Sequence, residues 1–287
     1  MASMRDIKRR KSSIQGTQQI TKAMKLVSTV KLQRSRANAE RTKEYFNTMY
    51  ETVKSILQRL GHVEHRYLNA NPSAKKAVLA ITANRGLAGG YNTNVVKLIT
   101  RHPLWRPEEL LIYSIGSKGR VAFVRYGYEV KELNGDIVEE PTFEDAMAIC
   151  QELLRAYEAG EIGEIYLAYT AFKNTVSHIP TLIKLLPVEV DDSESGAKPQ
   201  ATAIMNFEPE DVEALDLIVP KYITSLIYGA LMEAVASENG ARMQAMDNAT
   251  SNAEEMISDL SLKYNRARQG SITQELTEII AGADAIG

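Results

Sequence analysis

Apolar residues at the N-terminal end of the chain follow a helical period and predict one long α-helix. Residues 4–60 contain one glycine and no proline. From residue 45 onward the apolar positions are spaced by three or four residues, which is the spacing of one helical face. These positions are Tyr45, Met49, Val53, Ile56 and Leu60.

A second helical pattern occupies the C-terminal end, which has no proline after Pro220. Its apolar positions repeat as in the seam of a coiled coil, at Met246, Ala249, Ala253, Met256 and Leu260. Alanines one turn apart, at Ala241, Ala245, Ala249 and Ala253, favour close approach of two helix backbones. We therefore expect a long antiparallel coiled coil of the two ends. Rods of roughly 85 and 95 Å, at about 1.5 Å per residue, are longer than a domain of this size can cover, so other subunits must surround them.

The middle of the chain predicts an α/β domain. Residues 77–82, 110–115 and 165–170 are short apolar runs rich in β-branched and aromatic residues, as in strands buried on both faces of a parallel sheet. Helix-period segments at 93–100, 118–126 and 143–157 lie between the runs, so β-α-β units in the doubly wound style are expected. Two further strands are expected at 181–190 and 203–207, separated by the polar loop 191–200.

The expected fold class is thus α/β, with a Rossmann-like domain inserted into a long antiparallel coiled coil. The expected domains are an N-terminal helix at 1–60, the α/β domain at 75–208 and a C-terminal helix at 209–287.

A hydrophobic content of 44% is ample for a folded core. The uncharged stretch 222–232 is too short for the roughly 20 residues that span a bilayer, so no transmembrane helix is expected. The single cysteine, Cys150, lies in a helix-period stretch and is expected to be a buried thiol.

Charge is distributed unevenly along the chain. The first 43 residues carry twelve Lys and Arg against Asp6 and Glu40, a net charge of +10, whereas the remainder carries −12. The basic arm therefore requires an acidic partner. Nucleic acid is a weaker alternative, because the arm lacks interleaved aromatic residues and carries an apolar helical stripe that commits one face to packing. This stripe consists of Ile7, Ile14, Ile20, Met24 and Val27.

No catalytic, cofactor-binding or metal-binding site is expected. The glycine loop 84–92 follows a strand and opens a helix, but it matches neither dinucleotide-binding nor P-loop spacing. We expect its glycines to serve tight helix–sheet packing, with nucleotide binding as the weaker alternative. The scattered histidines, His62, His65, His102 and His178, have no nearby cysteine or carboxylate pair to complete a metal site.

Three blocks of the sequence resemble the γ subunits of rotary F-type ATP synthases. They are residues 7–33, beginning IKRRKSSIQGTQQITKAMK, residues 85–92, RGLAGGYN, and residues 238–283. The third block contains the I-T-x-E-x-x-E-I-x-x-G-A pattern of that family, at Ile272, Thr273, Glu275, Glu278, Ile279, Gly282 and Ala283.

The resemblance implies a central rotor stalk that couples ion flow to ATP synthesis and has no catalytic residues of its own. The implied partners are the α and β subunits of the catalytic ring, the ε subunit and the membrane c-ring, and the acidic partner of the basic arm is the β subunit. Met24, Arg242, Gln269 and Thr273 match family positions that contact β subunits. The family's chloroplast members carry a regulatory cysteine pair, which this chain lacks. With no transit peptide, a bacterial protein on the cytoplasmic face of the cell membrane is expected. A nucleotide-dependent enzyme and a nucleic-acid-binding coiled-coil protein are the competing hypotheses.

Overall fold

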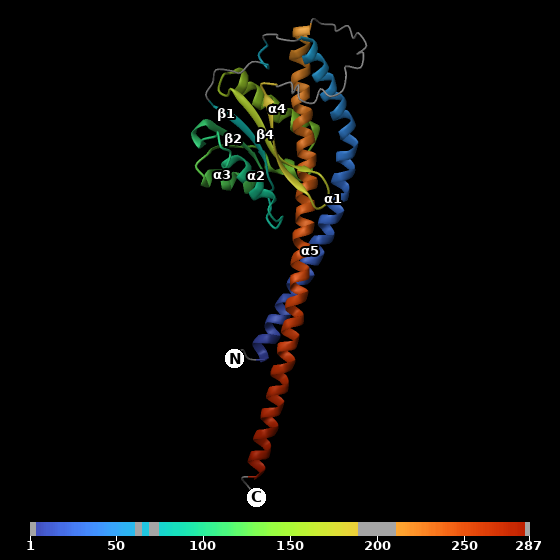
Figure 1. Cartoon of the computed structure of the whole chain (residues 1–287), viewed down its shortest axis with the longest axis vertical. Helices are drawn as coiled ribbons and strands as arrows, with labels where there is room; N and C mark the ends of the chain where they lie inside the picture. The colour runs from blue at the N-terminus through green and yellow to red at the C-terminus, as the bar shows by residue number, and fades with distance from the viewer. Residues whose placement is uncertain (1–3, 61–64, 69–74, 189–210, 285–287) are drawn as a thin grey trace. The chain divides into compact units, whose positions relative to one another are not determined.

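The computed structural model describes residues 4–60, 65–68, 75–188 and 211–284 (Figure 1). Two long helices, α1 (Met4–Leu60) and α5 (Asp211–Asp284), occupy the ends of the chain as their helical periods predict. The chain divides into two compact units. One comprises residues 1–29 and 242–287, and the other comprises residues 30–241. The α/β domain belongs to the second unit and the paired ends belong to the first.

The α/β domain contains a five-stranded sheet in the order β3-β2-β1-β4-β5. Strands β1 (Lys76–Ile81), β2 (Leu110–Ile115), β3 (Glu129–Glu132) and β4 (Glu164–Phe172) are parallel, and β5 (His178–Leu186) pairs antiparallel with β4. The connecting elements are the helices α2 (Tyr91–Thr100), α3 (Ser117–Arg125) and α4 (Phe143–Glu158) and the 3₁₀ turns η1 (Pro107–Glu109) and η2 (Gly135–Val138). The expected α/β class with two terminal helices is confirmed.

The structure departs from the expected strands in two places. Strand β3 was not expected, because its sequence EVKE is a mostly exposed, charged edge strand without an apolar run. The strand expected at 181–190 begins earlier, at His178, and ends at Leu186. The expected loop 191–200 and strand 203–207 lie outside the described residues.

Helices cover both faces of the sheet. On one face Leu79 and Ile81 of β1 pack with Ile149 and Leu153 of α4, and α5 adds a row of buried residues at Leu215, Val219, Ile223, Ile227 and Leu231. On the other face α2 and α3 contribute Val95, Ile99 and Phe123. The first half of α5 is therefore a core helix.

An 18-residue window in α5 has a mean hydropathy of 1.3, which by composition is apolar enough to span a membrane. However, 56% of the window is buried, so core packing explains its hydropathy.

Cys150 is buried in this core, as expected. Its Sγ donates to the carbonyl oxygen of Pro220 on α5 at 3.5 Å. Burial raises the pKa of the thiol to about 11, so the thiolate that reacts with oxidants and alkylating reagents is not formed at neutral pH.

A close helix–sheet contact lies at Gly119 of α3 and not at Gly86 of the glycine loop. The amide of Gly119 donates to Oγ1 of the fully buried Thr82 at 3.0 Å. A Cβ on Gly119 would lie 2.5 Å from Thr82 Oγ1. Gly86, in the loop where tight packing was expected, has open space around its Cβ position. The expectation was wrong for Gly86, because the contact that excludes a side chain joins residues 37 positions apart in sequence.

We predict that Gly119→Ala destabilises the domain, because the added methyl group must push Thr82 out of its hydrogen bonds. The expected loss in the free energy of unfolding is about 1–3 kcal/mol, the usual cost of overpacking. Gly86→Ala is the matched control and should change it by no more than about 0.5 kcal/mol. Urea unfolding of the full chain measures both. Equal effects of the two substitutions would contradict this account of the packing.

Candidate coupling surface on the paired helices

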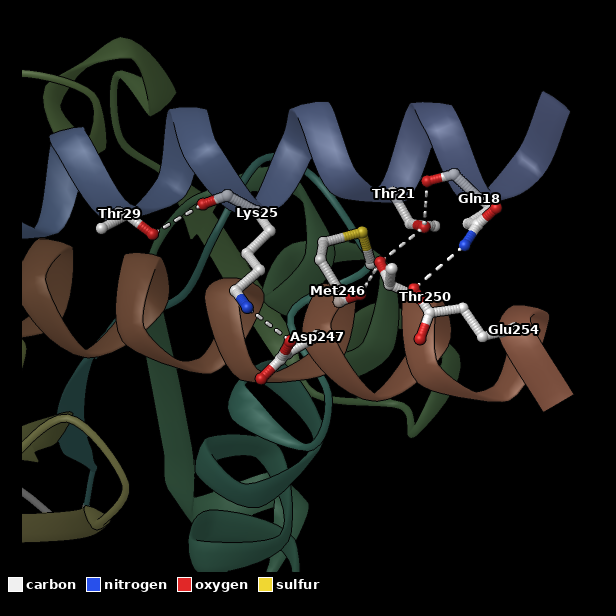
Figure 2. Close-up of polar contacts among 8 residues, drawn as sticks. All are labelled: Gln18, Thr21, Lys25, Thr29, Met246, Asp247, Thr250 and Glu254. Atoms are coloured by element: carbon white, nitrogen blue, oxygen red, sulfur yellow. Dashed lines mark hydrogen bonds and ion pairs between the residues drawn. The ribbon is translucent and has the colours of Figure 1, made fainter. Parts of the chain in front are cut away.

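Three side-chain contacts between the terminal segments fix their antiparallel register (Figure 2). Gln18 Nε2 donates to Glu254 Oε1 at 3.1 Å, the hydroxyl oxygens of Thr21 and Thr250 lie 2.8 Å apart, and Lys25 Nζ donates to Asp247 Oδ1 at 2.5 Å. Each step of three or four residues forward on α1 meets a step of four or three backward on α5. The two helices therefore pair antiparallel, as expected, with a side-chain contact at each turn.

The centre of this seam is built from small polar residues. Every seventh position of the α1 segment is buried or half-buried, at Ile7, Ile14, Thr21 and Ser28. The Thr21 and Thr250 hydroxyls also contact backbone carbonyls of their own helices, at Gln18 and Met246. Both polar atoms are thereby satisfied although the residues are buried, which removes most of the cost of placing them in the seam. The short side chains let the backbones approach closely.

The expected apolar stripe of α1 is only partly right. Ile7 is buried and Ile14 is half-buried, but the side chains of Ile20 and Val27 are 61% and 59% exposed. The stripe followed the largest apolar residues, whereas the seam follows a seven-residue repeat that passes through Thr21 and Ser28. That repeat is the sequence signal by which the seam could have been found.

The expected seam on α5 is largely right. Met246 and Ala253 are buried and Ala249 and Leu260 half-buried, but Met256 is 55% exposed and the neighbouring Ile257 takes the inward position. Of the alanine run, Ala241 packs in the α/β unit against Ala83, Ala88 and Tyr91.

The end of α5 continues past the start of α1. In the observed register Met4, the first described residue of α1, comes opposite about residue 268 of α5, and in Figure 1 the C-terminal end extends beyond the N-terminus. Gln269 and Thr273 lie on this unpaired end and are exposed. Thr273 Oγ1 donates to the Gln269 carbonyl at 2.9 Å, so these two of the expected contact residues are brought together on successive turns.

The other two expected contact residues lie farther along the pair. Met24, on α1, is half-buried beside the Lys25–Asp247 contact, and Arg242, on α5, is also half-buried. Arg242 and Gln269 are separated by about 40 Å of helix at 1.5 Å per residue. The four residues therefore form a series of surfaces along the rods and not one compact site.

Large apolar side chains are exposed on both helices. On α1 they are Ile20, Leu26 and Val27, and on the unpaired end of α5 they are Ile272, Leu276, Ile279 and Ile280. The α5 residues are spaced as one face of a helix, and Ile279 is 67% exposed. Grouped apolar side chains on a surface are typical of contact with other proteins. The basic residues of the arm add positive charge to the surface of α1.

The geometry gives no support to a nucleotide site in the α/β domain. In doubly wound folds the ligand binds at the carboxyl ends of the strands, where the strand order reverses, here between β1 and β4. Ala241 of α5 packs on the residues that follow β1, and Glu233 of α5 binds the amide of Phe172 at the end of β4. In the glycine loop, Asn92 Oδ1 accepts from the Ala83 amide at 2.8 Å. The part of the chain that the structure describes contains no group of three or more metal-ligating side chains.

Comparison with known proteins identifies the family. Residues 3–286 match the family model described as ATP synthase. The ATP synthase gamma chain of Lachnoclostridium phytofermentans is 60% identical over 291 residues, covering 100% of both chains. The chain is also 38% identical to the sodium-ion-specific ATP synthase gamma chain of Acetobacterium woodii, with 99% of each covered. The chain therefore belongs to the family of ATP synthase γ chains.

Solved structures with low sequence identity share the fold. A chain of the Euglena gracilis mitochondrial ATP synthase, from a structure of OSCP, F1 and the c-ring, is 20% identical with a TM-score of 0.69 and covers 99% of this chain and 94% of that chain. A chain of the Tetrahymena thermophila mitochondrial ATP synthase, from a structure of the central stalk and c-ring, is 23% identical with a TM-score of 0.59, covering 80% and 99%.

We predict that Thr21→Leu separates the paired helices, because the larger side chain cannot fit the space opposite Thr250. The substitution also leaves the hydroxyl of Thr250 without its partner across the seam. Overpacking of this kind costs about 1–3 kcal/mol. Ile20→Leu, a substitution at the exposed neighbouring position, is the control and should be close to neutral. Hydrogen exchange of amides in residues 243–257 measures the opening. Unchanged protection in Thr21→Leu would show that the seam does not hold the helices together.

Proposed function

We propose that the chain is the central rotor stalk of a bacterial F-type ATP synthase. As a γ chain it is a subunit of that enzyme, and the stalk couples ion flow through the membrane c-ring to ATP synthesis and hydrolysis by rotating within the α/β ring. The observation that carries the rotor role is the pair of long helices with apolar side chains exposed along it. Such helices require a surrounding sleeve of other subunits, and the ring of α and β subunits supplies it.

The finer features of this proposal come from the family resemblance and the charge pattern. The catalytic β subunits present acidic groups to the basic arm of α1, and the α/β domain binds the ε subunit and the c-ring. The chain has no catalytic residues of its own and is peripheral, on the cytoplasmic face of the cell membrane. No observation on the described residues favours the nucleotide-dependent enzyme or the nucleic-acid-binding protein.

The mechanism follows from symmetry. Three chemically identical β subunits differ in nucleotide affinity only if something asymmetric touches them differently. A pair of helices with different side chains around its circumference does so at every angle. The +10 charge of the arm lies on α1, so one side of the pair carries the basic arm and the other side carries α5. Turning this pair changes which of these surfaces each β subunit meets.

The free energy needed to switch a nucleotide site between states requires several contacts along the rods. Shifting a two-state site from 1:99 to 99:1 requires roughly 5.5 kcal/mol of differential contact. One exposed ion pair contributes about 0–1 kcal/mol. We therefore assign the coupling to several contacts along the rods, among them Met24, Arg242, Gln269 and Thr273. Their spread along the helices matches this requirement.

We predict that Arg242→Ala combined with Gln269→Ala slows steady-state ATP hydrolysis and proton pumping by the assembled complex, while nucleotide binding to the β subunits and assembly remain intact. Each single substitution should lower the rate by no more than about fivefold, because one surface contact contributes about 1 kcal/mol or less, and the effect of the double substitution should exceed that of either. Rates are measured on purified, fully assembled complexes.

Arg125→Ala is the matched control for the loss of an arginine. Arg125 is exposed at the end of α3 in the α/β domain and is not among the residues assigned to coupling. This variant should retain the wild-type rate. Wild-type hydrolysis and pumping in the Arg242/Gln269 double variant would overturn the assignment of these residues, and failure of the wild-type chain to assemble with α and β subunits would overturn the rotor proposal.

A further inference from the structure

The β4–β5 hairpin meets α5 at Gly240, where an added Cβ would overlap a side chain of the hairpin unless that side chain moved. A Cβ on Gly240 would lie 2.5 Å from Nε2 of His178, the first residue of β5, closer than atoms approach without displacement. His178 is half-buried, and its ring lies 6.2 Å from the ring of Phe172, its partner across the hairpin. The imidazole therefore occupies the space beside the helix backbone that a side chain would fill at any other residue.

A second contact joins the same hairpin to the same face of α5. Glu233 Oε2 accepts a hydrogen bond from the backbone amide of Phe172 at 3.2 Å. Glu233 lies seven residues, about two turns, before Gly240, so both contacts come from one side of the helix. Ser237, between them on that side, is completely buried. The hairpin end is thus fastened to α5 over two turns.

These contacts lie at the end of the stretch of α5 that the main core holds. The last α5 residue in the large apolar cluster is Ala234, and α5 belongs to the α/β unit only as far as Ala241. At Gly240 and Ala241 the helix contacts the hairpin and the small cluster of Ala83, Ala88 and Tyr91. A force that twists or bends α5 relative to the domain therefore acts on these contacts.

Steric fit holds His178 in place. Its buried Nε2 has no hydrogen-bond partner among the described residues. Burial also lowers the pKa of His178, which keeps the ring neutral at physiological pH. A close-packed contact resists displacement because interiors are dense and repulsion rises steeply with overlap.

We propose that His178 seated against Gly240 is the positioning contact that fixes the α/β domain on α5 and transmits turning force between them. The force-transmitting part of this inference rests on the proposed rotor function, whereas the fixing contact does not. His178 and Gly240 are positioning residues and contact no reacting group.

A double-mutant cycle tests the contact in the assembled complex. The variants are Gly240→Ala, His178→Ala and the two combined, with Gly16→Ala as the control for adding a methyl group to a helical glycine that has no neighbouring atom within 4 Å. Hydrogen exchange is measured for β5 and for residues 232–241 of α5, and the ratio of protons pumped to ATP hydrolysed is measured on the same samples.

Gly240→Ala should speed exchange in β5 about fivefold, because the methyl group displaces His178 and loosens the hairpin. In the His178→Ala background the same change should have no such effect, since the space is free and alanine favours helix over glycine. Gly16→Ala should leave β5 exchange unchanged. Gly240→Ala should also lower the number of protons pumped per ATP, and the combined variant should recover it relative to Gly240→Ala.

Results that differ from these expectations would overturn either the contact or its role in transmitting force. Additive effects of the two substitutions on exchange, or none from Gly240→Ala, would show that the residues are not coupled and would overturn the contact. Faster exchange with an unchanged pumping ratio would overturn the force-transmitting role. If the wild-type complex neither assembles nor pumps, the rotor proposal fails, and the exchange cycle on the full chain alone still tests the contact.

Discussion

The packing of the first half of α5 into the α/β core is the interaction on which the rest of the structure depends. Leu215, Val219, Ile223 and Ile227 lie in the same apolar cluster as the strands, so this part of the helix is fixed by the domain's own folding. The same helix then continues without interruption to Asp284. Because helix formation propagates residue by residue at little cost once a segment is fixed, the buried half stabilises the exposed half. One continuous helix thus joins a folded domain to a rod.

The exposed half has the opposite requirements. A core helix gains stability from large apolar residues, whereas a rod that pairs with one other helix and is surrounded by other subunits needs an outer surface suited to them. The seam is accordingly made from small residues such as Thr21, Thr250 and Ala253, and several large apolar residues, including Ile279, face outward. An isolated domain with this distribution would expose apolar surface to water, and within a ring of subunits the same side chains become contact residues. A stalk requires this distribution, with small residues in the seam and large apolar residues on the outer surface.

Much of the fold could be predicted from the sequence, because helical period and apolar runs are local signals. The terminal helices and the strands at β1, β2 and β4 follow from such patterns. The seam residues Thr21 and Ser28 were missed because burial of a small polar residue depends on the helix opposite. Strand β3 was missed because a charged edge strand has no apolar run. The need for glycine at 119 and 240 arises from Thr82 and His178, which lie 37 and 62 positions away in sequence. For the proposed coupling residues, the sequence supplied the family match and the structure added that Gln269 and Thr273 lie on the unpaired end of α5.

The most direct test of the central claim is to observe rotation of this chain in the complex. Leu104→Cys introduces a thiol at a residue that is 79% exposed in the α/β domain, while the buried Cys150 stays unreactive, so a visible probe can be attached at one position. With the α/β ring fixed to a surface, ATP should drive the probe in one direction, at a rate that follows ATP hydrolysis. Full hydrolysis by labelled complexes with no directional rotation of the probe would contradict the account.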